Sequence, residues 1–557
     1  MGGLDFVELY NAILRFAFPA LAMVVLWRCG KSLLGFQKEP ELWAWLVLPS
    51  GDRMAVTHWE NLIGRHKSCD LRLEYPTISR NHAVLTRYDD GSWTVSDVGS
   101  KGGVEVNGKD VSLKAVEYGD VISLGGVACT LVKLSKSEEQ EQATTRTRAG
   151  RMFSPAMTLL YVTLFEILTS LQFLLTAEAD NIPTLLMAFG GLMALQWVLF
   201  WSLRAMGRTG FEVETLAFFL TNMGLAVVAS SAPSELEKQL ISIALGVVLF
   251  LLVGWSLRNL ERAKKVRYIA AVGSILLLAF NLVFGTEQYG ATNWIYIGGM
   301  SFQPSELVKV CFVFVGASTL DRLLAKRNLI LFIIYSALIC GCLGLMNDFG
   351  TALIFFVAFL IVAYLRSGDF ASLSLICAGV GFGGFMLLRF KPYAMARFAS
   401  WGNVWADALD GGFQQTRSMM CIASGGLFGL GAGRGWLKYV AAADTDLVFA
   451  FIAEEWGLIL SCILVVTILF FAVFVAKSAP VARSSFYTIG ATTAAGIFVM
   501  QVMLNVFGTV DLLPLTGVTF PFVSNGGSSM LASWGLLAFI KAADTRRGGS
   551  FAVGSPE

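Results

Sequence analysis

The chain has 557 residues, of which 55% are hydrophobic and only 15% are charged, and its mean hydropathy is +0.64. Water-soluble domains do not have this balance, so the sequence predicts an integral membrane protein. The formal net charge of +2 offers no excess positive field, and we expect no nucleic-acid partner. All three histidines, His58, His66 and His82, lie in one polar stretch, which excludes a histidine-based site within the membrane portion.

The first apolar run predicts a transmembrane anchor over residues 8–28. Acidic Asp5 and Glu8 lie at its start, and basic Arg28 and Lys31 lie at its end. This order is the reverse of that in a signal peptide. We therefore expect a retained helix whose N-terminus lies outside the cell.

Residues 42–135 have a different composition, with short alternating runs broken by turn signals such as Asn107-Gly108. This pattern favours an all-β sandwich. A polar linker follows over residues 136–151, and its run Glu138-Glu139-Gln140-Glu141 predicts a flexible connection.

The rest of the chain predicts a polytopic α-helical membrane protein. With the anchor, about twelve further apolar runs make about thirteen transmembrane helices. Residues 152–209 hold two spans, 210–545 form a membrane core, and 546–557 form a tail. The twelve runs lie near residues 153–176, 183–205, 212–231, 237–257, 267–284, 304–321, 329–346, 349–366, 370–389, 448–476, 485–508 and 527–543.

Basic residues mark one side of these helices. The cluster Arg258–Arg267 and the pair Arg546-Arg547 fall on the same side as the β domain. The long 389–447 loop and the 508–526 loop fall on the other side. Because cytoplasmic loops are enriched in Lys and Arg, we expect the β domain and the C-terminal tail to be cytoplasmic and these two loops to lie outside the cell.

The β domain carries motifs in a particular order: Gly64-Arg65, Ser79-Arg80-Asn81-His82, Asp97-Val98-Gly99-Ser100 and Val106-Asn107-Gly108. This series resembles the forkhead-associated (FHA) domain over about ninety residues. The resemblance implies that the domain binds a phosphothreonine protein, such as a substrate of a Ser/Thr kinase. Arg65, Ser79 and Arg80 would bind the phosphate with charged and hydroxyl donors, and His82 would support their loop.

One departure from the FHA pattern leaves an alternative open. Where the family usually has an Asn after Ser100, this chain has Lys101-Gly102-Gly103. The domain could therefore keep the fold without binding phosphate.

Polar residues of the membrane portion gather in four clusters that we expect to face outward. The first, Gln303-Pro304-Ser305-Glu306, ends near Lys309, and the spacing of Glu306 and Lys309 predicts a structural charge pair. The second contains Asp348. The third runs from Arg397 to Gly457 and the fourth from Leu513 to Ser529.

These clusters contain, in order, Gln-Pro-Ser-Glu, Asp-x-Gly-Thr-Ala, Gly-Gly-Leu-Phe-Gly, Thr-Asp followed by Glu-Glu-x-Gly, and Pro-Phe-x-Ser-x-Gly-Gly-Ser-Ser. The series resembles the SEDS family (shape, elongation, division and sporulation; RodA, FtsW and SpoVE). The resemblance implies a peptidoglycan glycosyltransferase of the bacterial plasma membrane. Such an enzyme polymerises lipid II, a disaccharide-pentapeptide on undecaprenyl pyrophosphate, outside the membrane during elongation, division or sporulation.

The catalytic aspartate of the family maps onto Asp446. A carboxylate at this position can take the proton of the acceptor hydroxyl in an inverting displacement, since the diphosphate leaving group needs little acid help. Arg397 is the expected cation for the pyrophosphate. We expect no protein-bound metal. A divalent cation near the pyrophosphate is an open alternative, but the sequence has no cluster of ligands to support it. Further substrate-binding candidates are Gln414, Ser418, Asp348 and Ser528.

Other residues of the third cluster have structural interpretations. Asp446 precedes an apolar helix, so the alternative is that it is only an N-cap. Glu454 lies about 12 Å further along that helix, and we interpret it as a buried, paired structural group. The run Gly429-x-Gly431-x-Gly433-x-Gly435 predicts a flexible loop rather than a dinucleotide site.

The chain departs from the SEDS pattern at several positions. Ala441-Ala442-Ala443-Asp444 replaces Pro-Glu-x-His, and Asn293, Asn347 and Asn525 replace an Arg, a Pro and a Tyr. An additional carboxylate at Asp444 would change the pKa of the base or assist it.

Three hypotheses follow for the whole chain. The first is a lipid II polymerase controlled by phosphorylation and paired with a class B penicillin-binding protein as transpeptidase. The second is a lipid II flippase, which charges such as Glu306 and Lys309 would suit. The third is a catalytically silent scaffold that responds to phosphorylation.

Overall fold

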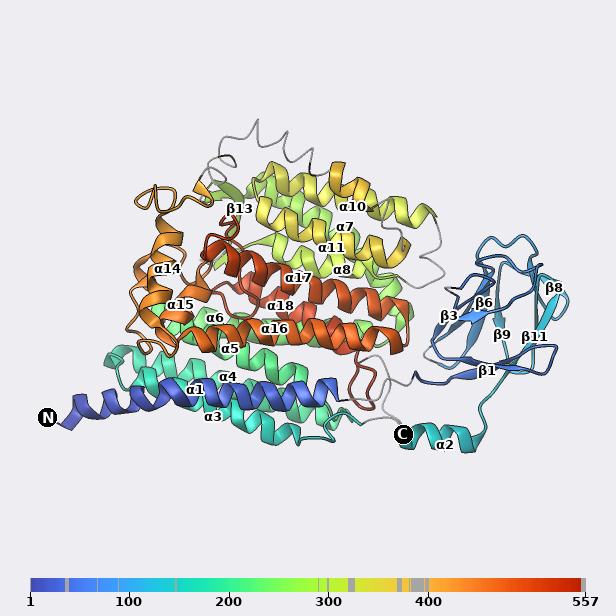
Figure 1. Cartoon of the computed structure of the whole chain (residues 1–557), viewed down its shortest axis with the longest axis horizontal. Coiled ribbons are helices and arrows are strands. Elements are labelled where there is room, and N and C mark those ends of the chain that lie inside the picture. The colour runs from blue at the N-terminus through green and yellow to red at the C-terminus, as the bar shows by residue number, and fades with distance from the viewer. Residues whose placement is uncertain are drawn as a thin grey trace.

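A computed structural model of the chain combines a bundle of long helices with a β-sandwich. The sandwich stands at one end of the helices, and helices α14 (Phe413–Gly425) and α15 (Val448–Glu455) stand at the other (Figure 1). We call these the sandwich end and the loop end. The structure describes residues 2–35, 40–67, 69–88, 90–145, 148–288, 290–297, 300–318, 326–367, 373–379, 381, 395 and 400–551.

Within the described residues, 10 helices are long and apolar enough to cross a membrane, so the chain is a polytopic α-helical membrane protein with a β-sandwich near its N-terminus. The helices that contain these spans are α1 (Gly2–Leu34), α3 (Pro155–Leu174), α4 (Ile182–Ala205), α5 (Glu212–Ser231), α6 (Leu236–Leu257), α7 (Leu260–Phe284), α10 (Lys326–Leu345), α11 (Phe349–Ser367), α16 (Leu458–Ser478) and α17 (Ser485–Thr509).

Two of the predicted spans differ from the observed helices, whereas α18 (Gly527–Ala542) matches its predicted run to within one residue. Helix α8 (Pro304–Gly316) is shorter than expected and has 13 residues. The predicted 448–476 span is divided between α15 and α16, because Gly457 has a φ of +95° and packs against the carbonyl of Leu427. Most of the predicted 370–389 span lies outside the described residues.

The connection between α7 and α8 contains a small antiparallel sheet at the loop end. Its strands, in spatial order, are β12 (Thr286–Gln288), β13 (Ala291–Ile297) and β14 (Met300–Phe302). The sheet brings Gln303 to the start of α8, where the side chains of the first polar cluster begin.

Helix α5 lies at the centre of the bundle, and 94% of the residues in its membrane-spanning part are buried. Near the sandwich end, Glu214 of α5 forms an ion pair of 3.0 Å with Lys541 of α18, and both side chains are 0% exposed. The Lys541 ammonium also donates to the carbonyl of Gly210 at 2.8 Å. A second buried ion pair joins Glu212 and Arg546 at 3.1 Å. These pairs fix the order in which the helices pack, because a buried charge is stable only when it is paired.

The β domain is a two-sheet sandwich, as predicted. One sheet has the order β2-β1-β11-β10-β7-β8 and the other the order β4-β3-β5-β6-β9. The strands are β1 (Ala44–Val47), β2 (Arg53–Val56), β3 (Glu60–Gly64), β4 (Leu71–Arg72), β5 (Ala83–Arg87), β6 (Trp93–Asp97), β7 (Val104–Val106), β8 (Lys109–Asp110), β9 (Leu113–Val116), β10 (Val121–Leu124) and β11 (Val127–Val132).

The prediction of a flexible linker after the sandwich is wrong over residues 136–145, which form helix α2 (Lys136–Thr145). Ser135 and Glu138 explain the helix. The amide of Ser135 donates to the Glu138 carboxylate at 2.8 Å, and the Glu138 amide donates to the Ser135 hydroxyl at 3.3 Å. This reciprocal pair is a capping box, which stabilises a helix start. Trp45 also donates to Glu138 at 3.2 Å and holds α2 on the sandwich.

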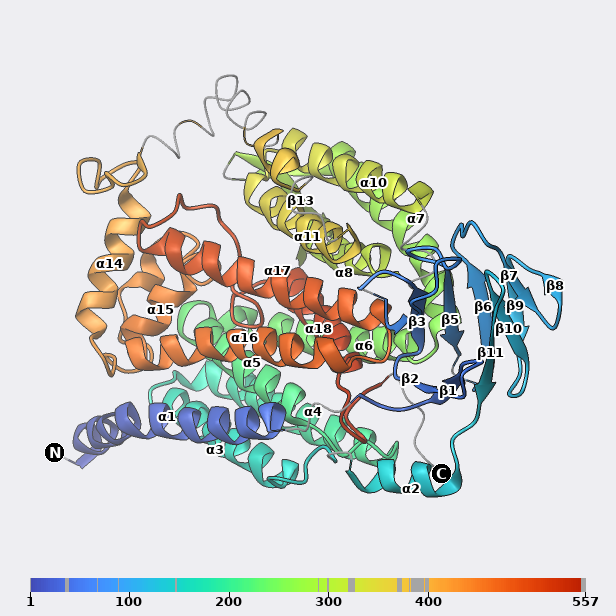
Figure 2. The same ribbon diagram turned by 45° about the vertical axis from the view of Figure 1, so that its right-hand side comes forward.

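The sandwich contacts the membrane core at the connection between α16 and α17. The amide of Trp59 donates to the carbonyl of Arg483 at 2.6 Å, and the ring of Trp59 lies 6.0 Å from that of Tyr487. Ser485, the first residue of α17, donates to the carboxylate of Glu60. Figure 2 shows β3 on the side of the sandwich nearest the helices.

The buried pair of α5 and α18 gives a testable prediction. Lys541→Met leaves the Glu214 carboxylate buried without its cation, and we expect the free energy of unfolding to fall by about 3–5 kcal/mol. Thermal unfolding of the detergent-solubilised protein measures the change as a lower unfolding temperature. The double variant Lys541→Met with Glu214→Leu removes both charges and should recover much of the loss. Equal unfolding temperatures for Lys541→Met and wild type would contradict this account.

Candidate active site and phosphothreonine-binding loops

The segment that carries Asp446 is held by two adjacent carboxylates at the end of α15. Glu454 accepts hydrogen bonds from the amides of Trp436 and Leu437, both at 2.9 Å. Glu455 accepts from the amides of Gly433 and Gly435 at 2.9 and 3.3 Å. Both acids are buried, so these hydrogen bonds satisfy amides of the segment that would otherwise lack a partner. Glu454 is buried as we expected, but its partners are backbone amides.

The glycine-rich run does not act as the flexible loop that its composition predicts. A Cβ atom at Gly425 or Gly429 would overlap the backbone of residues 453–457. A Cβ atom at Gly435 would lie 2.8 Å from the carboxylate of Glu454. Gly431 has a φ of +108°, which disfavours other residues. The glycines therefore allow the segment to pack closely against the end of α15.

Asp446 lies half-buried two residues before the start of α15. The N-cap of this helix is Leu447, with no side-chain cap, so Asp446 is not its N-cap. The side-chain amide of Asn505 on α17 donates to the carbonyls of both Asp446 and Val518 at 2.9 Å. The backbone at Gly517 approaches so closely that a Cβ there would lie 3.2 Å from Oδ2 of Asp446. The 508–526 loop thus lies against this carboxylate.

Asp444 has a different environment from Asp446. Its Oδ2 accepts hydrogen bonds from Ser231 at 3.1 Å and from the side-chain amide of Asn525 at 2.9 Å. The same amide group donates to Glu235 at 3.0 Å. Asp444 and Asn525 are two of the departures from the SEDS pattern, and here they are direct partners. The additional carboxylate therefore serves to connect the Asp446 segment to α5 and to the 508–526 loop.

Of the other third-cluster candidates, the structure brings Gln414 to the Asp446 segment. Its side-chain amide donates to the carbonyl of Ala441 at 2.9 Å. Ser418 is fully buried and donates to the carbonyl of Gln414 within its own helix at 2.8 Å. Arg397 lies outside the described residues.

Asp348 and Ser528 meet through Gln303. The Asp348 carboxylate accepts from the side chains of Gln303 at 3.2 Å and Asn293 at 2.9 Å, and from the amide of Thr351 at 3.1 Å. The Ser528 hydroxyl accepts from the amide of Gln303 at 2.8 Å. Asp348 is thus the N-terminal cap of α11. It also holds the connection between α7 and α8 through Asn293 of β13, which is another departure from the SEDS pattern.

The predicted charge pair on α8 is present in the structure. The Lys309 ammonium lies 2.7 Å from the Glu306 carboxylate, and the two side chains are 1% and 5% exposed.

Two residues that hold the site were missed from the sequence. Asn505 lies in a largely apolar run, and a strongly polar side chain inside a membrane helix is a signal that could have identified it. Glu455 was quoted only as part of a motif, because its backbone partners come from a loop of irregular structure.

The phosphothreonine-binding candidates come together on two neighbouring loops of the sandwich. The amide of Arg65 donates to the carbonyl of Ser79 at 3.0 Å, and that of His66 donates to the carbonyl of Arg80 at 3.1 Å. The Arg65 and Arg80 side chains are exposed. The Ser79 hydroxyl accepts from the amide of Lys101 at 2.9 Å, so its own hydrogen can point to a ligand.

His82 supports these loops as expected. It is fully buried, its Nδ1 accepts from the Ser79 amide at 3.1 Å, and its Nε2 lies 2.9 Å from the carbonyl of Gly103. A Cβ at Gly102 would lie 2.8 Å from Gly125. The glycines in the departure from the FHA pattern therefore permit close packing between loops.

The binding loops and the membrane contact lie at opposite ends of strand β3. Glu60 begins the strand beside α17, and Arg65 follows its last residue, Gly64. A strand rises about 3.3 Å per residue, so Glu60 and Arg65 are about 17 Å apart. The phosphate-binding candidates thus lie at the other end of β3 from the contact with α17.

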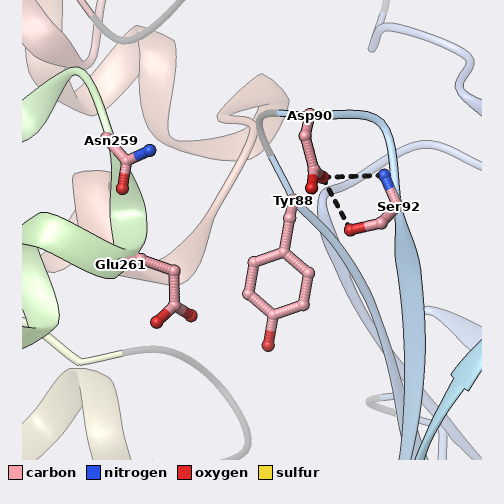
Figure 3. Close-up of a pocket in the computed structure, with 5 residues that line it drawn as sticks. All are labelled: Tyr88, Asp90, Ser92, Asn259 and Glu261. Carbon is pink, nitrogen blue, oxygen red and sulfur yellow. Dashed lines mark hydrogen bonds between the residues drawn. The ribbon is translucent and has the colours of Figure 1, made fainter.

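A pocket of about 290 Å³ separates the sandwich from the α6–α7 connection (Figure 3). Tyr88, Asp90 and Ser92 line it from the sandwich, and Asn259 and Glu261 line it from the start of α7. Hydrogen bonds from the Ser92 hydroxyl and amide lower the pKa of Asp90. The pocket therefore keeps an ionised, acidic wall at neutral pH.

Comparison with known proteins identifies both parts of the chain. The family model of FtsW, RodA and SpoVE, described as a cell cycle protein, matches residues 213–548, which is more than half of the chain. This chain belongs to the FtsW/RodA/SpoVE family. The FHA domain model matches residues 61–125. Helices α1, α3 and α4 and the sandwich precede the part that matches the FtsW/RodA/SpoVE model.

Several curated relatives are similar over this region. The probable peptidoglycan glycosyltransferase FtsW of Bacillus subtilis (strain 168) is 32% identical over 340 residues, which cover 56% of this chain and 83% of the relative. The stage V sporulation protein E of the same strain is 32% identical over 319 residues, covering 53% and 82%. A solved chain from a peptidoglycan synthase complex is 25% identical and covers 59% of this chain and 96% of its own, with a TM-score of 0.49.

The bridge made by Asn505 gives a second prediction. Asn505→Leu keeps the branched shape of the side chain but removes the amide that donates to the Asp446 and Val518 carbonyls. We expect the kcat for glycan synthesis by the purified protein to fall about 10- to 100-fold, because a small displacement of a catalytic group has this effect. The variant Leu504→Met on the same helix should retain the wild-type rate. A wild-type kcat for Asn505→Leu would contradict the positioning role.

Proposed function

We propose that this chain is a peptidoglycan glycosyltransferase that polymerises lipid II outside the plasma membrane, with Asp446 as the catalytic base. The observation that carries the proposal is the placement of Asp446. This chain belongs to the family, and its Asp446 carboxylate lies half-buried at the loop end. The segment that carries it is held by Glu454, Glu455 and Asn505. Curated relatives at about 30% identity are named peptidoglycan glycosyltransferases.

The chemistry needs one carboxylate. An acceptor sugar hydroxyl attacks the anomeric carbon of the donor, the bond to the pyrophosphate-lipid breaks, and Asp446 takes the hydroxyl proton. The diphosphate leaves as an anion, so no general acid is required, and a single displacement inverts the anomeric carbon. Asp444 connects segments of the site instead, because its carboxylate accepts hydrogen bonds from Ser231 and Asn525.

The sidedness of the proposal follows from charge. Arg258, Arg546 and the β-sandwich lie at the sandwich end, and Asp446 lies at the loop end. Because basic residues favour the cytoplasmic side, the sandwich end is cytoplasmic and the site faces outward. Lipid II presents its sugars there, and a class B penicillin-binding protein would cross-link the product.

The sandwich adds control by phosphorylation. Arg65, Ser79 and Arg80 form a cationic, hydroxyl-bearing surface that suits phosphothreonine. Since this surface lies at the other end of β3 from the contact with α17, a phosphorylated protein would reach it without displacing that contact. Recruitment of that protein to the site of wall synthesis is the simplest consequence.

The pairing of Glu306 and Lys309 favours the polymerase over the flippase. These residues were the charges that suited a transport path, and they neutralise each other in a buried position of α8. A structural role accounts for both.

The catalytic role of Asp446 is tested with labelled lipid II. Asp446→Asn should lower the polymerisation rate at least about a hundredfold, since a general base contributes about 10²- to 10⁴-fold. Asp444→Asn is the matched control and should keep most of the activity. Full activity of Asp446→Asn would refute the proposal. If neither the wild type nor the variants polymerise lipid II with the transpeptidase partner present, the result would favour the hypothesis of a catalytically silent scaffold.

Phosphate recognition is tested separately on the full chain. Arg65→Ala should weaken binding of a phosphothreonine peptide library at least about tenfold, because it removes a charge-assisted contact. Arg72→Ala is the control, since Arg72 pairs with Glu74 on the surface. Equal binding by Arg65→Ala and wild type, or no binding by wild type, would contradict the phosphothreonine site.

A further inference from the structure

Helix α1 precedes the family-matched region, yet it reaches the segment that leads to Asp446. It packs against α3, α5 and α16, and its first half lies at the loop end (Figure 1). There the ring of Phe16 lies 4.7 Å from that of Phe428. The guanidinium of Arg15 donates to the carbonyl of Leu430 at 2.6 Å. Two consecutive residues of α1 thus contact the turn formed by residues 427–431.

A polar connection between α1 and α3 supports the same region. The side-chain amide of Gln172 on α3 donates to Asn11 on α1 at 2.8 Å, and the indole of Trp456 lies 3.3 Å from the oxygen of Gln172. Asn11 and Gln172 are buried. Trp456 directly follows Glu455, so this connection ends beside the carboxylates that hold the glycine-rich segment. Both helices lie outside residues 213–548, the part that the family shares.

Arg15 is a half-buried cation in α1. It stands eight residues into a span that begins at Val7, where a cation is rare unless it has a polar partner. In the described part of the chain, its guanidinium donates to the carbonyl of Leu430, and a charged donor makes a stronger hydrogen bond than a neutral one.

The contact is well placed to affect the catalytic segment. The amide of Leu430 donates to the carbonyl of Glu454 at 2.9 Å, and that of Gly431 donates to the carbonyl of Glu455 at 2.8 Å. The turn held by Arg15 is therefore continuous with the backbone of the two acids that fix residues 433–437. That stretch leads through the 3₁₀ turn at Leu437–Tyr439 to Asp446.

We propose that Arg15 is a positioning residue for glycosyl transfer, supported by Asn11 and Gln172. In this proposal α1 and α3 form a clamp on the 427–431 turn. The catalytic part of this inference rests on the proposed function. The clamp itself does not, since it concerns the order of the turn. The chain thereby uses helices added to the family core to hold the segment in which it departs from the family at Asp444.

The clamp is tested by hydrogen–deuterium exchange of the peptide covering residues 425–437 in the full-length protein. Arg15→Met should accelerate exchange about tenfold, as expected for the loss of one charged hydrogen bond. Arg28→Met is the matched control, since Arg28 is on the same helix but bonds Thr158 at the sandwich end. Wild-type exchange in Arg15→Met would overturn the clamp.

The positioning role is tested by kinetics on the same variants. Arg15→Met should lower kcat about tenfold with KM within about twofold and with an unchanged unfolding temperature. Arg15→Lys, which restores a donor, should recover part of kcat, and Gln172→Met should act in the same direction as Arg15→Met. Faster exchange with a wild-type kcat would overturn the positioning role. A wild type without activity would refute the proposed function, and the exchange result would still decide the clamp.

Discussion

The loop end depends on the adjacent carboxylates of Glu454 and Glu455 being satisfied by backbone amides. The segment between α14 and α15 has little regular structure, so its amides cannot be paired within a helix or sheet. Four of them donate to these two acids, and two more donate to the acids' carbonyls. Both acids are buried, so each bond pairs a donor and an acceptor that water does not reach. An irregular segment thereby becomes a fixed support for Asp446.

The requirement also explains the glycines and the break in the helix. Positions 425, 429 and 435 all face the end of α15 so closely that a Cβ would not fit there. Gly457 ends that helix and lets the turn at residues 427–431 pack against it. On its other side, the backbone of this turn contacts α1 through the carbonyl of Leu430. The added helix and the family core thus meet at a surface made of backbone.

One helix contacts both functional regions. Ser485 at the start of α17 bonds to Glu60 of the sandwich, and Asn505 near its end bonds to the carbonyl of Asp446. The two residues are twenty positions apart, about 30 Å along the helix. The sandwich and the candidate active site therefore rest on the same rigid element, although they stand at opposite ends of the bundle.

Much of the fold followed from pattern: the apolar runs gave the spans, and the FHA motif series gave a sandwich in which His82 holds the loops. The sequence also predicted the Glu306–Lys309 pair, because their spacing places both charges on one helical face. The failures have physical causes. Composition cannot distinguish glycines that permit close packing from glycines that permit motion, and the capping box at Ser135 outweighed the polarity of α2. Partners distant in the chain, such as Asp444 with Asn525, have no signal in one sequence.

The most direct test of the central claim is the stereochemistry of the product. Purified full-length protein is incubated with isotopically labelled lipid II, and NMR gives the anomeric configuration of each new glycosidic bond relative to the donor. One catalytic carboxylate acting as a base predicts glycan strands with inverted configuration. Retention would contradict the account, since it requires a second carboxylate as nucleophile, and the absence of polymer from folded protein would contradict the activity itself.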